Sequence, residues 1–173
     1  MRDFQVGGRS SVFAENGMCA TSTPLAAKVA VQLLESGGNA IDAAIGAAVL
    51  LGFCEPQSTG IGGDCFVLVQ PPNKTKPVAL NGSGRSPSGL DSEKMRSSGF
   101  DSMPLYGVES VTVPGAIDAF CQLSNDWGRK GLKFSLAPAI NYAENGIVVG
   151  PRTAFDWANS ASILKGDARD HFL

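Results

Sequence analysis

The stretch from residue 40 to residue 69 constrains the fold most, because it joins a helix, a glycine-rich loop and a strand. Residues 40–53 are almost entirely apolar, which is typical of a helix buried in a soluble protein. Pro56 must end this helix, because it has no N–H to donate and pushes the preceding residue towards extended geometry. Glycines at positions 60, 62 and 63 then allow sharp turns and close approach of a chain or ligand. Residues 65–69 are apolar and partly β-branched, and we predict a buried strand there.

By itself, the glycine-rich loop allows two simple interpretations. It can be a plain connection between a helix and a strand. It can also be a phosphate cradle, but the sequence lacks the Gly-x-x-x-x-Gly-Lys-Ser/Thr pattern. Its glycines also precede a strand, whereas phosphate-binding glycines open a helix. The residues alone therefore favour the plain connection over the cradle.

Two motifs in this region support a more specific interpretation. They are residues 37–44 (Gly-Gly-Asn-Ala-Ile-Asp-Ala-Ala) and residues 55–63 (Glu-Pro-Gln-Ser-Thr-Gly-Ile-Gly-Gly). At this spacing they resemble the gamma-glutamyltransferase family of self-cleaving N-terminal-nucleophile hydrolases, and the resemblance extends from about Gly17 to Arg152. It implies an α+β protein with the layered α/β/β/α sandwich of those hydrolases, completed by a second chain. The family's large chain is considerably longer, so this sequence resembles the N-terminal part of a large subunit.

The resemblance also implies a mechanism. In the family, the nucleophile is the N-terminal threonine of the second chain, freed when the precursor cleaves itself, and the adjacent α-amine takes the hydroxyl proton. Backbone N–H groups stabilise the tetrahedral intermediate, and the acyl group passes to water or an amino acid. We therefore expect no catalytic residue, metal or cofactor in this chain, which alone should be inactive. The implied partners are the second chain, in a heterodimer or a dimer of heterodimers, and a small amide substrate.

Arg85 is the main candidate for substrate binding. In glutamyl-processing members an arginine just after the corresponding strand binds the substrate α-carboxylate, for which its planar fork is suited. Here residues 81–87 read Asn-Gly-Ser-Gly-Arg-Ser-Pro, with the arginine closer to the proline than usual and no acidic neighbour. When aligned on Pro87, Ser83 or Gly84 falls near the family's arginine position. Arg85 then either reaches the carboxylate from a shifted loop or has another role, including that of a solvated charge.

The same departure from the family pattern bears on the substrate. The Gly-Ser-Gly-Arg sequence resembles a branch that includes amidohydrolases for oxamate and cephalosporin side chains. Our first expectation is acyl transfer or hydrolysis of γ-glutamyl compounds such as glutathione, and the alternative is an amidohydrolase acting on oxamate or another N-acyl amide. A non-catalytic scaffold or binding protein is the alternative from another class, and it would lack a self-cleaved partner that begins with threonine.

The glycine-rich loop supplies a second group of candidates. We expect a wall near the substrate site, formed by Thr59, Gly60, Gly62 and Gly63. An equally simple interpretation is that these residues pack beneath the nucleophile strand. Asp42 and Glu55 are acidic residues that suggest a general acid–base pair. Both are expected at helix ends, where capping and the helix dipole explain an acidic residue.

Composition and charge exclude several other classes. The net charge is −2 and no basic stripe is present, so a nucleic-acid partner is not expected. The longest apolar run, residues 43–53, is too short to span a bilayer, and the N-terminus has no apolar signal region. We therefore expect a cytoplasmic protein, with the reservation that a leader could have been removed. The four cysteines include no Cys-x-x-Cys pair and are interpreted as buried free thiols, and His171 is the only histidine, which disfavours zinc.

Local signals predict the remaining elements. Residues 1–16 are expected to form an irregular arm, and residues 17–173 part of the hydrolase domain. Thr23 and Pro24 should open a helix that ends at Gly37, and Asn39 should cap the next one. These two helices are expected to cover one face of a sheet. Further predicted elements are a strand at 18–22, a hairpin of strands 65–70 and 77–81, and helices at 91–98, 116–126, 135–145 and 151–164.

Overall fold

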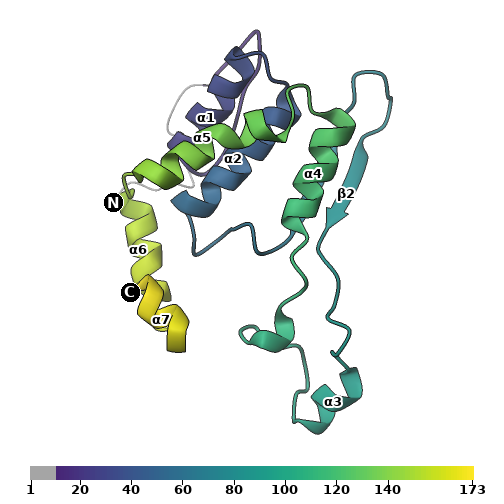
Figure 1. Cartoon of the computed structure of the whole chain (residues 1–173), viewed down its shortest axis with the longest axis vertical. Coiled ribbons are helices and arrows are strands. Elements are labelled where there is room, and N and C mark those ends of the chain that lie inside the picture. Colours follow the sequence, from purple (N-terminus) through teal and green to yellow (C-terminus); the bar gives the residue numbers. More distant parts are fainter. Residues whose placement is uncertain (1–10) are drawn as a thin grey trace.

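The computed structural model describes residues 11–173, which combine helices with one small antiparallel sheet (Figure 1). Helix α2 lies between α1 and α5, α4 lies against the hairpin, and an excursion that contains α3 projects away from the helices. This mixture of helix and sheet confirms the α+β class. The elements are α1 (Pro24–Glu35), α2 (Ala40–Cys54), β1 (Cys65–Val69), β2 (Val78–Gly82), α3 (Ser92–Ser97), the 3-10 helix η1 (Val108–Ser110), α4 (Ala116–Trp127), α5 (Leu132–Asn145), α6 (Pro151–Ser160) and α7 (Gly166–Phe172).

Helix α1 begins and ends where the sequence predicts. Pro24 occupies its first turn, and the chain leaves the helix through Gly37, whose φ of +86° suits glycine. Thr23 sits at the N-cap position, but its side chain makes no capping bond. Its hydroxyl instead donates to the carboxylate of Glu55, which follows α2. Thr23 therefore joins the start of α1 to the end of α2.

Helix α2 begins with a reciprocal capping box. The Asn39 side chain accepts hydrogen bonds from the first turn, and the Asp42 carboxylate accepts one from the Asn39 N–H at 2.9 Å. Asp42 is fully buried and also accepts bonds from the N–H groups of Arg129 and Lys130 and from the hydroxyl of Ser135. One carboxylate thus joins the start of α2 to the turn between α4 and α5. This structural role explains Asp42 without acid–base chemistry.

The core consists of two apolar clusters that meet at α2. One cluster joins α1, α2 and α5 around residues such as Val29 and Leu50. The other joins Ile45 of α2, Val69 of β1 and Phe120 of α4. The prediction that α1 and α2 cover the sheet as a pair is therefore wrong for α1. The covering helices are α4 and α2, because α1 packs on the side of α2 that faces away from the sheet.

The hairpin forms as predicted, but only one of its faces is covered. Strands β1 and β2 pair antiparallel, with Cys65 opposite Gly82. Val67 of β1 packs into the second cluster, whereas Phe66 and Leu68 are 65% and 76% exposed on the other face. The prediction of a fully buried β1 is therefore wrong within this chain. The cause is that helices lie on one face of the sheet alone.

Three further predictions need correction or lie outside the structure. No strand forms at residues 18–22, because β1 and β2 pair with each other and the described residues offer it no partner strand. The last predicted helix, 151–164, ends at Ser160, and α7 follows after a turn. Residues 1–10 of the predicted arm lie outside the described residues, and residues 11–16 form no helix or strand. None of the helices among residues 11–173 is long and apolar enough to cross a bilayer.

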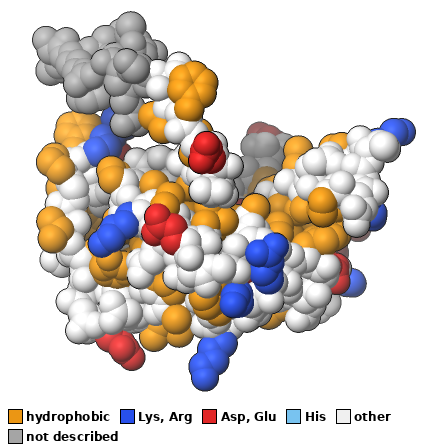
Figure 2. Space-filling view, turned by 90° about the horizontal axis from the view of Figure 1, so that it is seen from above, with side chains coloured by type: hydrophobic (Ala, Val, Ile, Leu, Met, Phe, Trp, Pro, Cys, Tyr) orange, Lys and Arg blue, Asp and Glu red, His pale blue; other side chains and the backbone are white. Residues whose placement is uncertain are grey.

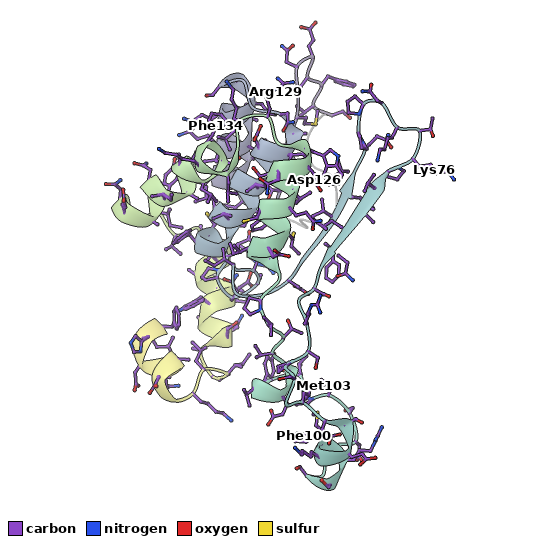
Figure 3. All side chains as sticks on the ribbon, turned by 45° about the vertical axis from the view of Figure 1, so that its right-hand side comes forward. Lys76, Phe100, Met103, Asp126, Arg129 and Phe134 are labelled. Carbon is purple, nitrogen blue, oxygen red and sulfur yellow. The ribbon has the colours of Figure 1, made fainter. Side chains whose placement is uncertain are left out.

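Apolar side chains reach the surface in many places. Figure 2 shows them spread over one face of the molecule, between lysine and arginine side chains. The excursion between β2 and α4 adds more, and Figure 3 shows Phe100 and Met103 on it, far from the helical part of the molecule. Leu105 and Val108 of the same excursion are 82% and 80% exposed. Helices and hairpin together therefore leave much apolar surface uncovered.

Candidate functional site

The glycine-rich loop ends against the start of helix α4. The carbonyl oxygen of Gly63 accepts hydrogen bonds from the N–H groups of Gly115 at 3.0 Å and Ala116 at 3.1 Å. These are two of the N–H groups that the first turn of a helix leaves without a partner inside the helix. Gly63 is thereby fixed to the segment that leads into α4.

The loop that contains Arg85 is held by the same segment. The N–H of Val113 donates to the carbonyl oxygen of Arg85 at 2.9 Å, in an isolated antiparallel bridge. One residue earlier, the Thr112 hydroxyl donates to the carbonyl oxygen of Ser83 at 3.1 Å. The two candidate loops are thus brought together by residues 112–116, which we call the 112–116 segment.

Glycines make this crossing of backbones possible. A Cβ atom on Gly84, whose φ is +77°, would lie 1.9 Å from the carbonyl oxygen of Val113. A Cβ atom on Gly115 would lie 2.4 Å from both the oxygen of Gly82 and the nitrogen of Gly84. No side chain fits at either position, so the Gly-Ser-Gly-Arg and Pro-Gly sequences have a common steric cause. This contact was not predicted from the sequence, in which the two short glycine motifs were the available signal.

The crossing leaves the side chain of Arg85 free. Arg85 is exposed, and within residues 11–173 the one ion pair joins Arg152 to Asp156 in α6. Ser83 is half-buried, with its hydroxyl 3.4 Å from the carbonyl oxygen of Gly84 and its N–H bonded to the Asn81 side chain at 3.0 Å. A guanidinium with no acidic partner and a hydroxyl two residues away can together bind a carboxylate.

The other candidates divide between two places. The N–H of Thr59 donates to the Glu55 carbonyl oxygen at 3.1 Å, in the turn that follows α2, and its side chain lines a groove. Gly62 and Gly63 lie further along the exposed loop, and Gly63 alone contacts the 112–116 segment. A Cβ atom on Gly62 would meet nothing within 4 Å, so crowding does not require glycine there. The structure thus brings Gly63 to Ser83 and Arg85 and leaves Thr59 facing the groove.

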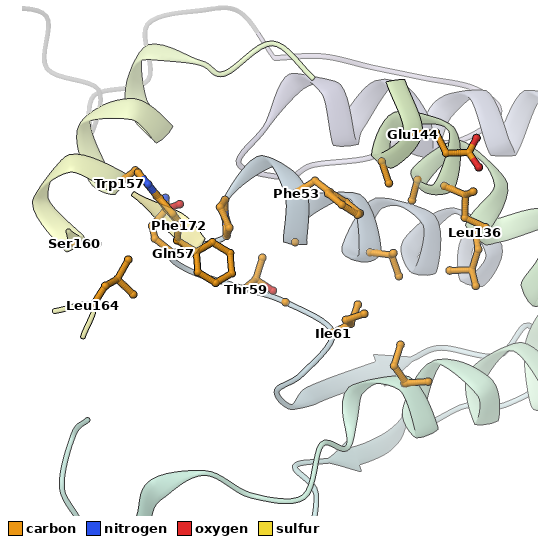
Figure 4. A pocket seen from close by; sticks show the side chains of 18 of the residues that line it. Phe53, Gln57, Thr59, Ile61, Leu136, Glu144, Trp157, Ser160, Leu164 and Phe172 are labelled. Carbon is orange, nitrogen blue, oxygen red and sulfur yellow. The ribbon is translucent and has the colours of Figure 1, made fainter. Parts of the chain in front are cut away.

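The groove beside Thr59 is large and mainly apolar. It has a volume of about 860 Å³ and lies between the end of α2, α5 and the C-terminal helices (Figure 4). Phe53, Leu136 and Trp157 are among its lining residues, and Trp157 contacts Phe172 edge to face at a centroid distance of 6.1 Å. Ile117 of α4 is 42% exposed and also lines this groove. Such a surface suits the binding of apolar side chains.

The four cysteines are free thiols, and two of them, Cys54 and Cys65, lie in environments that disfavour the thiolate. Cys54 is buried as predicted, whereas Cys19, Cys65 and Cys121 are only half-buried. Burial raises the pKa of Cys54, and the neighbouring Glu55 raises it further. Burial also raises the pKa of Cys65, with a further contribution from Asp64. Among residues 11–173, no three or more His, Cys, Asp and Glu side chains gather as a metal site would require.

Comparison with known sequences identifies a family that matches most of this chain, including both loops. A profile of the family described as Gamma-glutamyltranspeptidase matches residues 26–173. The chain is 37% identical over 141 residues to a glutathione hydrolase-like proenzyme of Bacillus subtilis, a match that covers 80% of this chain and 26% of that protein. It is 32% identical over 162 residues to an oxamate amidohydrolase proenzyme of Klebsiella pneumoniae, covering 90% of this chain and 30% of that one.

Solved structures of similar proteins also superimpose on this chain. A cephalosporin acylase from Bacillus halodurans superimposes with a TM-score of 0.82 at 44% identity, over 96% of this chain and 32% of that one. A gamma-glutamyltranspeptidase from Helicobacter pylori superimposes with a TM-score of 0.77 at 28% identity, over 88% of this chain and 44% of that one. The chain thus spans about a quarter to a third of the length of the curated relatives it matches.

Proposed function

Because the chain belongs to the gamma-glutamyltranspeptidase family, we propose that it forms the N-terminal part of the large subunit of an autoprocessed enzyme. That enzyme hydrolyses or transfers an acyl group, with γ-glutamyl amides such as glutathione as its first substrates. The proposal rests on the family match over residues 26–173, which includes both loops at the crossing. Two of its relatives are proenzymes named for hydrolysis of glutathione or oxamate, and both of these reactions cleave an amide bond.

The nucleophile in this proposal lies outside the chain. Within residues 11–173, the raised pKa values of Cys54 and Cys65 keep both thiols protonated at neutral pH. His171 is exposed in α7 and its ring contacts the Asp167 carbonyl oxygen. An N-terminal threonine on a second chain would supply the missing group, since its own α-amine can take the hydroxyl proton.

Attack of that threonine on the substrate amide forms an ester and releases the amine, which takes the proton held by the α-amine. Water or an amino acid then attacks the ester, returns a proton to the threonine and leaves with the acyl group. A transferase and a hydrolase differ only in this second nucleophile. The role left to the present chain is to bind and orient the acyl group.

Uncovered surface supports a partner chain. Phe66 and Leu68 project from the open face of the hairpin, and apolar side chains of this size are stabilised when removed from water. A second sheet stacked on this face would bury them and complete an α/β/β/α sandwich. We propose that the second chain supplies that layer in a heterodimer.

Arg85 is proposed to bind the substrate carboxylate, and this role can be tested by Arg85→Lys in the complete enzyme. Lysine keeps the charge but cannot form the paired hydrogen bonds of a guanidinium. A hydrogen bond to a charged group contributes about 1.5–3 kcal/mol, so we expect KM for a γ-glutamyl anilide to rise about tenfold or more. Arg96→Lys is the matched control, because Arg96 is also exposed but lies in α3 on the excursion. An unchanged KM for Arg85→Lys would remove Arg85 from the site.

The second candidate function is that of an amidohydrolase acting on oxamate or another N-acyl amide. Two observations favour it: the Gly-Ser-Gly-Arg sequence, which lacks the family's acidic neighbour, and the 44% identity to the cephalosporin acylase. Turnover of oxamate without turnover of γ-glutamyl anilide would establish this alternative. A non-catalytic scaffold is the remaining alternative, and turnover of either substrate would exclude it.

A further inference from the structure

Four hydrogen bonds join the two candidate loops to the 112–116 segment. Gly63 accepts two of them and Arg85 accepts the third, all from backbone N–H groups. The fourth comes from the Thr112 hydroxyl, which donates to the Ser83 carbonyl oxygen. The pairing of Cys65 with Gly82 places the two loops side by side at one end of the hairpin, and the shared segment holds both of them there. Thr112 supplies the one side-chain bond among the four.

The crossing has little freedom to shift. Gly84 and Gly115 approach the opposing backbone so closely that a Cβ atom would overlap it. The segment also continues into α4, whose first residue, Ala116, is buried in the second core cluster with Phe120. Because close-packed interiors transmit displacement, a movement of this segment moves both loops. The 112–116 segment therefore connects both loops to the core.

We propose that the 112–116 segment positions the two loops for substrate recognition and that Thr112 is a positioning residue for the carboxylate-binding group. This inference rests on the proposed function, because it requires that Arg85 contact the substrate. Thr112 holds the carbonyl group of Ser83 by a hydrogen bond. The backbone dihedral angles of Ser83 and Gly84 determine the direction in which the Cα–Cβ bond of Arg85 points. Without the hydroxyl, the Arg85 backbone stays bridged to Val113 while the Ser83 carbonyl loses the side-chain hydrogen bond that helps to fix its direction.

Thr112→Val is the direct test, because it removes the hydroxyl and keeps the β-branched shape that suits extended backbone. The measurement is kcat and KM of the complete enzyme with γ-glutamyl p-nitroanilide, or with oxamate if that is the amide it hydrolyses. A typical net hydrogen bond is worth about 1 kcal/mol, so we expect KM to rise about fivefold with kcat within about twofold. Thr112→Ser retains the hydroxyl and should restore a KM close to that of the unaltered enzyme.

A second substrate separates positioning from a general structural effect. The analogue has its carboxylate replaced by a neutral carboxamide, so it forms no ion pair with Arg85. We expect Thr112→Val to raise KM for the carboxylate substrate and to leave KM for the carboxamide unchanged. An equal rise for both substrates would overturn the positioning role, because a distorted site weakens binding of either one.

The results for Arg85→Lys and Thr112→Val together distinguish a failure of this inference from a failure of the proposed function. If Arg85→Lys raises KM and Thr112→Val does not, Arg85 stays in the site and the positioning role of Thr112 is wrong. If neither variant changes KM, the carboxylate site itself is wrong, and the inference is wrong with it. The same holds if the complete protein hydrolyses none of these amides.

Discussion

Replacing the buried carboxylate of Asp42 tests how the helices are held together. In Asp42→Asn, the amide oxygen can still accept the shorter bonds from the N–H groups of Asn39 and Arg129, at 2.9 and 3.1 Å. The Lys130 N–H, which lies 3.3 Å from both carboxylate oxygens, then keeps one acceptor and meets the new NH₂ group, a second donor, at the other position. A hydrogen bond to a charged group contributes about 1.5–3 kcal/mol against about 1 kcal/mol for a neutral one, so the loss of charge weakens each of the retained bonds. We expect a total destabilisation of about 2–4 kcal/mol.

Urea denaturation followed by circular dichroism measures this loss. With a slope of about 2 kcal/mol per molar urea, the midpoint should fall by about 1–2 M. Asp118→Asn is the matched control, because Asp118 lies exposed in the first turn of α4 and its charge there is worth at most about 1 kcal/mol. Equal midpoints for the two variants would show that the Asp42 carboxylate does not stabilise the junction of α2 with the turn between α4 and α5.

Two further predictions concern the crossing and a thiol. Gly84→Ala should destabilise the protein by at least about 2 kcal/mol, because its Cβ would overlap the Val113 oxygen, whereas Gly62→Ala should have an effect below about 1 kcal/mol. Similar urea midpoints for these variants would argue against the crossing. Cys65 should react slowly with iodoacetamide at neutral pH, because burial raises its pKa. The contribution of Cys65 to the free energy of unfolding should be complete below the ordinary thiol pKa of 9.0. It should decrease as pH rises above 9.0, because the thiol ionises in the unfolded chain before it ionises in the folded one. A free energy of unfolding that rises with pH above 9.0 would contradict this expectation.

Elements with local signals were predictable from the sequence. Pro24, Gly37 and Asn39 define the ends of α1 and the start of α2 by backbone chemistry that needs no distant partner. Asp91 likewise caps α3 by accepting a hydrogen bond from the N–H of Glu93. Two short strand-like segments separated by a polar connection were sufficient to predict the hairpin.

Features that depend on distant partners were not predictable. A strand at residues 18–22 needs a neighbouring strand, and the described residues provide none. The burial of β1 depends on what covers each face of the sheet, and an apolar sequence alone cannot distinguish one covered face from two. Local signals placed Asp42 at a helix start, but its bonds to Arg129 and Ser135 come from residues far along the chain.

The candidate site was predicted in part. The sequence indicated Arg85 and the glycine-rich loop through their resemblance to family motifs. It did not indicate Thr112, because a single threonine before Val-Pro-Gly has no distinctive pattern. The contact of Gly84 with Val113 is likewise a meeting of two backbones, which composition and periodicity do not encode.

The central claim is that this chain works with a second chain that begins with the nucleophilic threonine. The most direct test is the intact mass and N-terminal sequence of every polypeptide that co-purifies with it. We predict a second chain whose first residue is threonine, produced by cleavage of a common precursor. Recovery of this chain alone, or of an uncleaved precursor without such a threonine, would contradict the catalytic role and leave only the fold of the family.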